Sequence, residues 1–455
     1  MNLTSDHVPR LVRVLAVPAS VGFFFSTLFN VVDTWWAGRI STHAQAALSL
    51  SFPVFFILIA AGSGLSQGST ALIASALGAG NTARARHYVV QSAILGILAG
   101  LAITVVGLIA APSLFRLLGA TEDYLGLSLA YMNSILLGGV FFLLQSVLNG
   151  GLQAQGDTRT FRNVLMVGCL ANMALDPWFL YGGLGLPPMG ISGIAAATVV
   201  ITAVGAVLVG LQLRRSPLGS QIVAADLRPC PIAFREIAVQ GLPASLNMMT
   251  VALGTFVITW FASRFSEKTV AAYGIATRIE QILLLPTIGL NIATLTLSGQ
   301  NFGAGRPARV QEAWRTAIRY GLTLMTACGV LLFAFAGPLM ECFSSDPEVV
   351  DTGRTYLHFA ALTIGSYVVV HQTVFMLQGL RRPMFGLAIG LFRQVLAPAA
   401  LFPWLSFHLA LGTSGLWTGI FLINWSAALV AWLHGRRVLG HLMEEREKDS
   451  HDRVA

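Results

Sequence analysis

The segment that decides the fold is LVRVLAVPASVGFFFSTLFNVVDTWWAGRIS, residues 11–41, because part of its pattern recurs 225 positions later. Pro18-Ala19-Ser20 returns as Pro243-Ala244-Ser245, and Thr34-Trp35 returns as Thr259-Trp260. These matches need no gap, so they indicate a tandem duplication. Further pairs at the same spacing are Arg39 with Arg264, Ser41 with Ser266, residues 77–80 with 302–305, and Arg84 with Arg309.

The composition indicates a helical protein that crosses a membrane many times. Of the 455 residues, 55% are hydrophobic and only 11% are charged, whereas a soluble domain carries about 25% charged residues. Apolar runs of ~20 residues, enough to cross a bilayer core, recur without the period-two alternation of a membrane barrel. We predict twelve spans, at residues 14–38, 46–76, 88–113, 125–150, 161–183, 190–213, 236–262, 270–302, 316–341, 354–379, 384–408 and 413–435.

The duplication divides these spans into two sets of six. We predict an all-α polytopic membrane protein with two pseudo-symmetric lobes, residues 1–213 and 235–437. A cytoplasmic linker, 214–234, joins the lobes, and a charged tail, 438–455, is expected to be partly disordered. Duplicated bundles that rock against each other around a central site are typical of secondary transporters.

The distribution of basic residues predicts the orientation in the membrane. Most Lys and Arg residues lie at the N-terminus, on the connections from even to odd spans, or on the C-terminal tail. The positive-inside rule then places both termini in the cytoplasm, for a multi-pass protein of the cytoplasmic (inner) membrane. The formal charge of +8 arises from these loops, so we expect no nucleic-acid partner.

Six ionisable residues fall within the predicted spans, where charge is costly and usually functional. Asp33 is one of them, and its repeat partner is Ile258. Because the second half accepts an apolar residue there, the carboxylate is not needed by the fold, although an interfacial carboxylate near Arg39 is the alternative reading. The six residues are Asp33, Asp176, Arg278, Glu280, His371 and Arg393.

Asp176 lies in a segment that favours a cation or proton site. Asn172 and Asp176 are four residues apart and share a helix face. Pro177 lacks an N–H group, which frees the carbonyl of Met173 and predicts a kink beside the carboxylate. A low-dielectric site penalises a charged carboxylate, which suits proton uptake and release near neutral pH. Asp33 and Asp176 are therefore the candidate coupling acids, and an ordinary kink with an interfacial Asp176 is the alternative.

The remaining ionisable residues belong to the second half. Arg278 and Glu280 are two residues apart and do not face each other on a helix. Arg393 is the expected partner of Glu280, in either a structural ion pair or a gating contact. His371 is a candidate proton relay, or a buried neutral histidine.

An enzyme is the main rival class. The match to a serine nucleophile elbow at Gly64-Leu65-Ser66-Gln67-Gly68 falls inside an apolar helical run, whereas the elbow needs a strand–turn–helix context. The sequence contains no phosphate-cradling Gly-Lys-Ser/Thr loop and no zinc-ligand spacing. We therefore expect no enzymatic activity, no cofactor and no resident metal, and energy must come from an ion gradient.

Five motifs stand in order along the chain: Asn30-Val31-Val32-Asp33-Thr34 with Gly38-Arg39, Leu77-Gly78-Ala79-Gly80-Asn81, Gln155-Gly156-Asp157-Thr158-Arg159, Val270-Ala271-Ala272-Tyr273-Gly274 with Arg278-Ile279-Glu280, and Gly299-Gln300-Asn301-Phe302-Gly303-Ala304-Gly305. Together they resemble the multidrug and toxic compound extrusion transporters. The closest resemblance is to the bacterial branch named after DNA-damage-inducible protein F, over nearly the whole chain.

This resemblance implies two six-helix lobes around a central cavity, and export of amphipathic, often cationic compounds in exchange for H⁺ or Na⁺. It implies that Asp33 is the key coupling acid and that Asn172 and Asp176 complete the site from the fifth helix. Thr198 on the sixth helix is the further member. Na⁺ held by Asp33, Asn172 and Asp176 is the alternative to a proton.

One departure from the wider family bears on the coupling mode. Another branch carries a Glu on the seventh helix and an Asp on the tenth, and Val251 and Tyr367 stand at those places here. First-lobe coupling by protons is therefore favoured. The expected protein is a monomeric antiporter in the lipid bilayer that exports small amphipathic drugs or metabolites. The alternative is a flippase for a lipid-linked precursor, which would need a basic cavity around Arg278 and Arg393.

Overall fold

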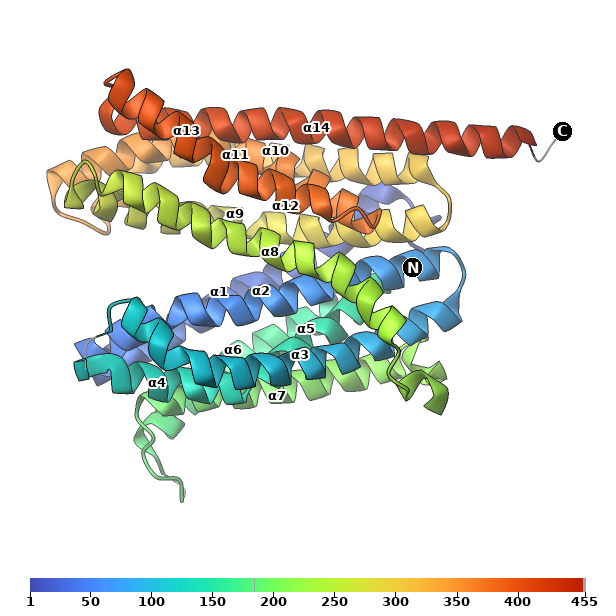
Figure 1. Ribbon diagram of the computed structural model, residues 1–455, viewed down its shortest axis with the longest axis horizontal. Helices are drawn as coiled ribbons and strands as arrows, with labels where there is room; N and C mark the ends of the chain where they lie inside the picture. The colour runs from blue at the N-terminus through green and yellow to red at the C-terminus, as the bar shows by residue number, and fades with distance from the viewer. Residues whose placement is uncertain (121, 184, 453–455) are drawn as a thin grey trace. The chain divides into compact units, whose positions relative to one another are not determined.

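The computed structural model describes residues 1–120, 122–183 and 185–452, and helices make up nearly all of this part of the chain (Figure 1). The first half contains α1 (Val8–Ile40), α2 (Thr42–Gly78), α3 (Thr82–Leu117), α4 (Glu122–Leu137), α5 (Gly139–Ala154), α6 (Arg159–Tyr181) and α7 (Ile191–Arg215). After the short turns η1 (Gly219–Gln221) and η2 (Ala224–Leu227) follow α8 (Pro231–Ala262), α9 (Glu267–Gly303), α10 (Pro307–Glu341), α11 (Pro347–Gly379), α12 (Met384–Leu391), η3 (Phe392–Leu396), α13 (Ala397–Pro403), η4 (Trp404–His408) and α14 (Gly412–Asp452).

The helices confirm the prediction of about twelve membrane spans. Eleven stretches in the described residues are long and apolar enough to cross a bilayer, and α4 with α5, bent by 46°, makes a twelfth. One of the eleven is Met384–His408, in which the π-helical turns η3 and η4 interrupt the α-helix. The expected disorder of the tail is wrong for the described residues, because α14 continues as one helix to Asp452 (Figure 1).

The duplication is visible in the local structure of the two halves. Helices α2 and α9 are both 37 residues long, and each follows a serine N-cap. The Ser41 hydroxyl accepts a hydrogen bond from the Ala44 N–H at 3.0 Å, and the Ser266 hydroxyl accepts one from the Thr269 N–H at 3.1 Å. Serine at this position satisfies a helix N–H that has no partner within the helix. The repeated serines therefore start equivalent helices.

A second repeated contact lies just before these caps. The Arg39 guanidinium lies 4.3 Å from the ring centre of Trp35, and the Arg264 guanidinium lies 4.4 Å from that of Trp260. Each arginine follows its tryptophan by one helical turn, so the side chain can reach back over the ring. The same pair closes the first span of each half.

Packing divides the chain into two compact units whose boundaries also repeat. One unit is Val21–Ser245, and the other combines Met1–Ser20 with Leu246–Ala455. The boundaries after Ser20 and Ser245 lie 225 positions apart. Each follows a proline inside a helix, Pro18 in α1 and Pro243 in α8. The duplicated halves and the packing units therefore differ. Met1–Ser20 belongs to the unit that contains most of the second half, and the beginning of the second half, up to Ser245, belongs to the unit that contains most of the first half.

In the unit Val21–Ser245, the linker is fastened to α3. The Gln91 amide donates to the carbonyls of Asp226 and Arg228 at 2.8 and 2.9 Å, and its oxygen accepts from the Cys230 N–H at 2.9 Å. Arg86 pairs with the Asp226 carboxylate at 2.6 Å. One buried amide therefore replaces the regular backbone bonds that this turn lacks.

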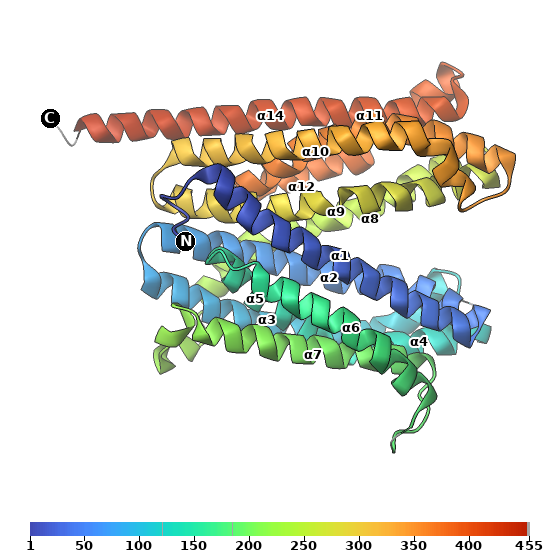
Figure 2. The ribbon, with the colours of Figure 1, turned by 180° about the vertical axis from the view of Figure 1, so that it is seen from behind.

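The other unit fastens the N-terminal segment in a corresponding place. Asn301, near the end of α9, donates to the Leu3 carbonyl at 3.2 Å, and Arg309 on α10 donates to the Asp6 carbonyl at 2.7 Å. Helix α11 packs against α9, α10 and α14 and is central to this unit (Figures 1 and 2).

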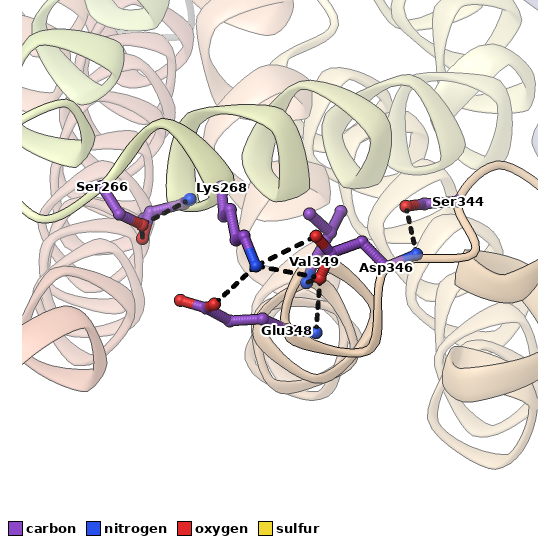
Figure 3. Close-up of polar contacts among 7 residues, drawn as sticks. Ser266, Lys268, Ser344, Asp346, Glu348 and Val349 are labelled. Atoms are coloured by element: carbon purple, nitrogen blue, oxygen red, sulfur yellow. Dashed lines mark hydrogen bonds and ion pairs between the residues drawn. The ribbon is translucent and has the colours of Figure 1, made fainter.

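Figure 3 shows how the beginning of α11 is tied to the beginning of α9. Asp346 is the N-cap of α11, and its carboxylate accepts from the Glu348 N–H at 2.9 Å. Lys268 on α9 lies 3.0 Å from the Asp346 carboxylate and 2.9 Å from that of Glu348. The lysine therefore neutralises two carboxylates at the N-terminus of α11, which is the end of the helix where its dipole favours negative charge.

Candidate functional site

A buried cluster joins three residues that the sequence singled out. The Asn172 side-chain amide donates to the Asp33 carboxyl at 3.0 Å and to the Asp176 carboxyl at 2.8 Å. Asn172 and Asp176 lie one turn apart on α6, and Asp33 comes from α1. Asn172 and Asp176 are fully buried and Asp33 is 5% exposed. A single amide therefore bridges two carboxyl groups away from solvent.

Thr198 completes this cluster from α7, which packs beside α6 (Figure 2). Its hydroxyl donates to Asp33 at 3.3 Å, and it also lies 3.0 Å from the Ile194 carbonyl. Because a hydroxyl has one proton, it can serve only one of these acceptors at a time. Thr198 is therefore the weaker support of Asp33, and Asn172 is the stronger one.

Two oxygen atoms of the cluster accept no hydrogen bond from an amide or hydroxyl group of the described residues. They are Oδ1 of Asn172 and Oδ2 of Asp176, both buried. Buried polar atoms are normally paired, so these acceptors are available to a proton or a hard cation. With the Asp33 carboxyl and the Thr198 hydroxyl they form an oxygen-rich site, which is the donor set that Na⁺ or H⁺ would need.

Tyr131 is a site neighbour that the sequence analysis missed. It lies on α4, is 5% exposed, and is close enough to Asp33 and Asp176 for their charges to act on its hydroxyl. A neutral tyrosine in an apolar span carries no signal comparable to a charged residue. Only the packing of α4 into the unit reveals its position.

The second-half residues surround a separate cavity of about 160 Å³. Glu280, His371 and Arg393 all line it, whereas Arg278 is exposed. The expected ion pair between Glu280 and Arg393 is not present among the described residues. Glu280 instead accepts a hydrogen bond from the Tyr356 hydroxyl at 2.6 Å. The tyrosine reaches Glu280 from α11, a contact that charge complementarity does not predict.

Arg393 and His371 are placed by aromatic contacts. The Arg393 guanidinium lies 5.3 Å from the ring centre of Tyr367, and the His371 ring stacks on the same tyrosine at 6.3 Å. Val251 and Tyr367, which stand where another branch carries acids, both line this cavity. The cavity is therefore not uniformly basic, as the lipid-precursor alternative would require, because Glu280 faces it together with Arg393.

The serine motif is part of a helix contact. Residues 64–68 lie inside α2, so the strand–turn–helix context of a nucleophile elbow is lacking. A Cβ atom at Gly68 would lie 2.6 Å from the Gly241 nitrogen of α8, and one at Gly64 would lie 2.0 Å from the Ser245 hydroxyl. Glycines four residues apart let two helix backbones approach closely. This spacing explains the motif without any chemistry at Ser66.

Comparison with known proteins agrees with this architecture. The MatE family model matches residues 18–178 and 243–401, together more than half of the chain. The two matched segments begin 225 positions apart. The family model therefore recognises both copies of the duplication found in the sequence.

Individual relatives cover most of the chain. The FAD transporter of Shewanella oneidensis is 29% identical and covers 87% of this chain and 87% of its own. The probable multidrug resistance protein YoeA of Bacillus subtilis is 27% identical and covers 80% and 79%. A solved structure of a MOP superfamily transporter from Pyrococcus furiosus has a TM-score of 0.90 at 27% identity and covers 97% of this chain and 98% of its own.

The duplicated helices, their arrangement and the family match lead to one conclusion. The chain has the fold of the solved relatives over nearly its whole length, and its membrane spans number about twelve. It is a membrane transporter by family and not an enzyme. The chain belongs to the MatE family, whose model matches both of its halves.

Proposed function

We propose that this protein is a secondary antiporter that exports amphipathic, cationic drugs or metabolites in exchange for protons. The observation that carries the proposal is the bridge of Asn172 between Asp33 and Asp176. Two carboxyl groups joined by one amide form a buried site that can take up and release a proton. A relative named a probable multidrug resistance protein supports drug cargo, and one named a FAD transporter supports metabolite cargo, although FAD itself is an anion.

The coupling follows from competition for the same charge. When Asp33 and Asp176 are ionised, the site attracts a cationic substrate, and when protons occupy it, that attraction is lost. A ligand shifts a conformational equilibrium only by its differential affinity for the two states. Proton loading from outside would therefore reshape the first-half helices and expel the substrate, and proton release inside would reset the site.

The proton is the favoured coupling ion over Na⁺. The Asn172 amide donates to both carboxyl groups, but a second ionised carboxylate in a dry site would still repel the first. A single proton relieves that repulsion without any rearrangement of ligands. Na⁺ would instead need several oxygen ligands at once, and the two unpartnered oxygens of Asn172 and Asp176 are the atoms that could supply them.

The setting of this activity is the cytoplasmic membrane. The charge distribution of the loops supports cytoplasmic termini, and the motifs around Asp33 and Glu280 support the branch named after DNA-damage-inducible protein F. We propose a monomeric carrier, with two duplicated halves that need no second copy. The flippase alternative gains no support from the second-half cavity, where Glu280 stands with Arg393.

The test is uptake of ethidium into inverted membrane vesicles, driven by an imposed pH gradient without sodium. We expect uptake by the wild-type protein and its loss in Asp33→Asn and Asp176→Asn. Asp351→Asn is the matched control, because Asp351 is exposed and its carboxylate pairs with Arg354 at the surface. Coupled uptake that survives in the Asp33→Asn, Asp176→Asn double variant would refute the proposal. Uptake that a sodium gradient drives and a pH gradient does not would show that the coupling ion is Na⁺ and not the proton.

A further inference from the structure

The second-half cavity contains buried polar groups that the proposed antiport does not use. It is lined by Glu280 from α9, Arg393 from η3 and Asn424 from α14. These residues are 6%, 9% and 6% exposed. Three elements of one packing unit therefore direct charged or polar side chains into the same space. None of the three belongs to the Asp33 cluster.

Each of these residues has an atom without a hydrogen-bond partner in the part of the chain that the structure describes. The acceptors are Oε1 of Glu280 and Oδ1 of Asn424, and the donors are Nε and Nη1 of Arg393. A buried polar atom left unpaired destabilises the folded protein, and a charged one does so more strongly. These four atoms are buried behind the cavity wall, but the side chains that carry them all line the cavity, and Glu280 and Arg393 bring opposite charges to it.

Other contacts hold these residues in place, and the Tyr367 hydroxyl also lies within hydrogen-bond reach of the Glu280 carboxyl. The second Glu280 oxygen accepts from Tyr356 at 2.6 Å, and the Asn424 amide donates to the Ile420 carbonyl at 2.7 Å. Arg393 lies against the Tyr367 ring at 5.3 Å. It also belongs to a π-helical turn, a feature common at functional sites. The site is therefore preorganised.

The two signs of charge specify the ligand. Glu280 and Arg393 do not pair with each other, so a singly charged ligand would satisfy one and leave the other buried and unmatched. A ligand with both charges satisfies both. We propose that this cavity binds a small zwitterion, with its carboxylate on Arg393 and its ammonium group on Glu280 and Asn424. An Arg guanidinium holds a carboxylate by charge-assisted hydrogen bonds.

The volume of the cavity and its aromatic lining narrow the class of ligand further. The cavity of about 160 Å³ is smaller than the roughly 300–1,000 Å³ typical of pockets for drug-sized ligands. Tyr273, Tyr356 and Phe402 contribute rings to its wall. The ligand is thus of amino-acid size with an apolar or aromatic substituent. Val251, Thr255 and Gln281 line the cavity and are exposed, so they mark its opening.

The experiment is isothermal titration calorimetry on the full-length protein in detergent with three matched probes: phenylalanine, 2-phenylethylamine and 3-phenylpropionate. The probes share a ring but carry both charges, only the cation or only the anion. Charge-assisted hydrogen bonds contribute about 1.5–3 kcal/mol, which corresponds to about tenfold or more in affinity. We expect phenylalanine to bind at least about tenfold more tightly than either analogue.

Two variants assign the charges. Arg393→Gln should weaken the binding of phenylalanine and 3-phenylpropionate but not that of 2-phenylethylamine. Glu280→Gln should weaken the binding of phenylalanine and 2-phenylethylamine but not that of 3-phenylpropionate. Val251→Trp blocks the opening at an exposed position and tests the site without altering a buried charge. Val207→Trp, exposed and outside the cavity, is its control.

The outcomes are distinct from those of the antiport test. Asp33→Asn should leave phenylalanine affinity unchanged even where it abolishes proton-driven uptake. If none of the probes binds the wild-type protein, the cavity holds only water and the proposal is wrong. Equal binding of all three probes, or phenylalanine binding that survives Val251→Trp, would equally overturn it.

Discussion

The Asn172 amide donates to the Asp33 carboxyl at 3.0 Å and joins residues that are 139 positions apart in the sequence. This hydrogen bond connects α1 with α6, and the same amide also bonds Asp176. The two acids therefore share a neighbour, in addition to the direct contact between their carboxyl groups. A change at Asn172 should alter the behaviour of both.

Asn172→Ala should abolish most proton-coupled transport although it leaves both acids in place. Removal of the amide takes this donor from Asp176 and leaves Asp33 with the weaker bond from the Thr198 hydroxyl, and the loss of a donor to a buried group costs about 1–3 kcal/mol. We expect the uptake rate to fall by at least about tenfold and the pH dependence of uptake to shift. Asn30→Ala is the control, because Asn30 is exposed and its side chain donates to the Ser26 carbonyl of its own helix. Unchanged uptake in Asn172→Ala would show that the bridge has no role.

Thr198→Val should have a smaller effect than Asn172→Ala. The Thr198 hydroxyl is 3.3 Å from Asp33 and has a nearer acceptor in the Ile194 carbonyl at 3.0 Å. A typical hydrogen bond contributes about 1 kcal/mol, so we expect uptake to fall by about fivefold. Thr198→Ser keeps the hydroxyl and should retain most of the rate. If Thr198→Val were as inactive as Asp33→Asn, the ranking of Thr198 below Asn172 as a support of Asp33 would be wrong.

Gly68→Ala should destabilise the protein without touching the candidate site. The added Cβ atom would meet the Gly241 nitrogen at 2.6 Å and its Cα at 2.8 Å, both of them backbone atoms. Overpacking of this kind costs about 1–3 kcal/mol. Thermal unfolding in detergent should show a lower midpoint for Gly68→Ala. Gly126→Ala, where a Cβ meets nothing within 4 Å, should keep or raise it, and equal midpoints would argue against the close helix contact.

The cap of α11 should give a pH-dependent contribution to stability. Hydrogen bonds from Lys268 and from the Glu348 N–H hold the pKa of the Asp346 carboxyl below its ordinary value of 3.8 (Figure 3). A lowered pKa in the folded state means that the ionised form stabilises the fold above 3.8, and that this stabilisation is lost as pH falls through the folded-state pKa.

Asp346→Asn should therefore lower the unfolding midpoint at neutral pH, and the difference from wild type should shrink in acid. The contribution is modest because the ion pair is exposed. Asp351→Asn, in an exposed pair within one helix, is the comparison. A difference that grows as pH falls would contradict the direction of the Asp346 pKa.

Much of the fold could be predicted because the duplication and the apolar runs are strong, long-range signals. The repeated Ser41 and Ser266 start equivalent helices, and the spans follow from length and hydrophobicity. The packing units could not be predicted in the same way. The boundaries after Ser20 and Ser245 depend on which helix surfaces meet, and the pattern of apolar residues does not encode that choice.

The site was predictable where it involves charge. Asp33, Asn172 and Asp176 stood out because polar groups in a membrane span are rare, and the structure brings them together. Tyr131 did not stand out, because a tyrosine in an apolar span carries no charge. The partner of Glu280 also differed from expectation, since Tyr356 reaches it and Arg393 does not.

The measurement that tests the central claim most directly is proton movement in proteoliposomes loaded with a pH-sensitive dye. An outward or inward ethidium gradient is imposed without any initial pH gradient, and the internal pH is followed. The account predicts proton flux opposite to ethidium with the wild-type protein, no flux with Asp33→Asn, and wild-type flux with Asp351→Asn. Ethidium-driven proton flux that persists in the Asp33→Asn, Asp176→Asn double variant would contradict the claim that these carboxyl groups couple the two movements.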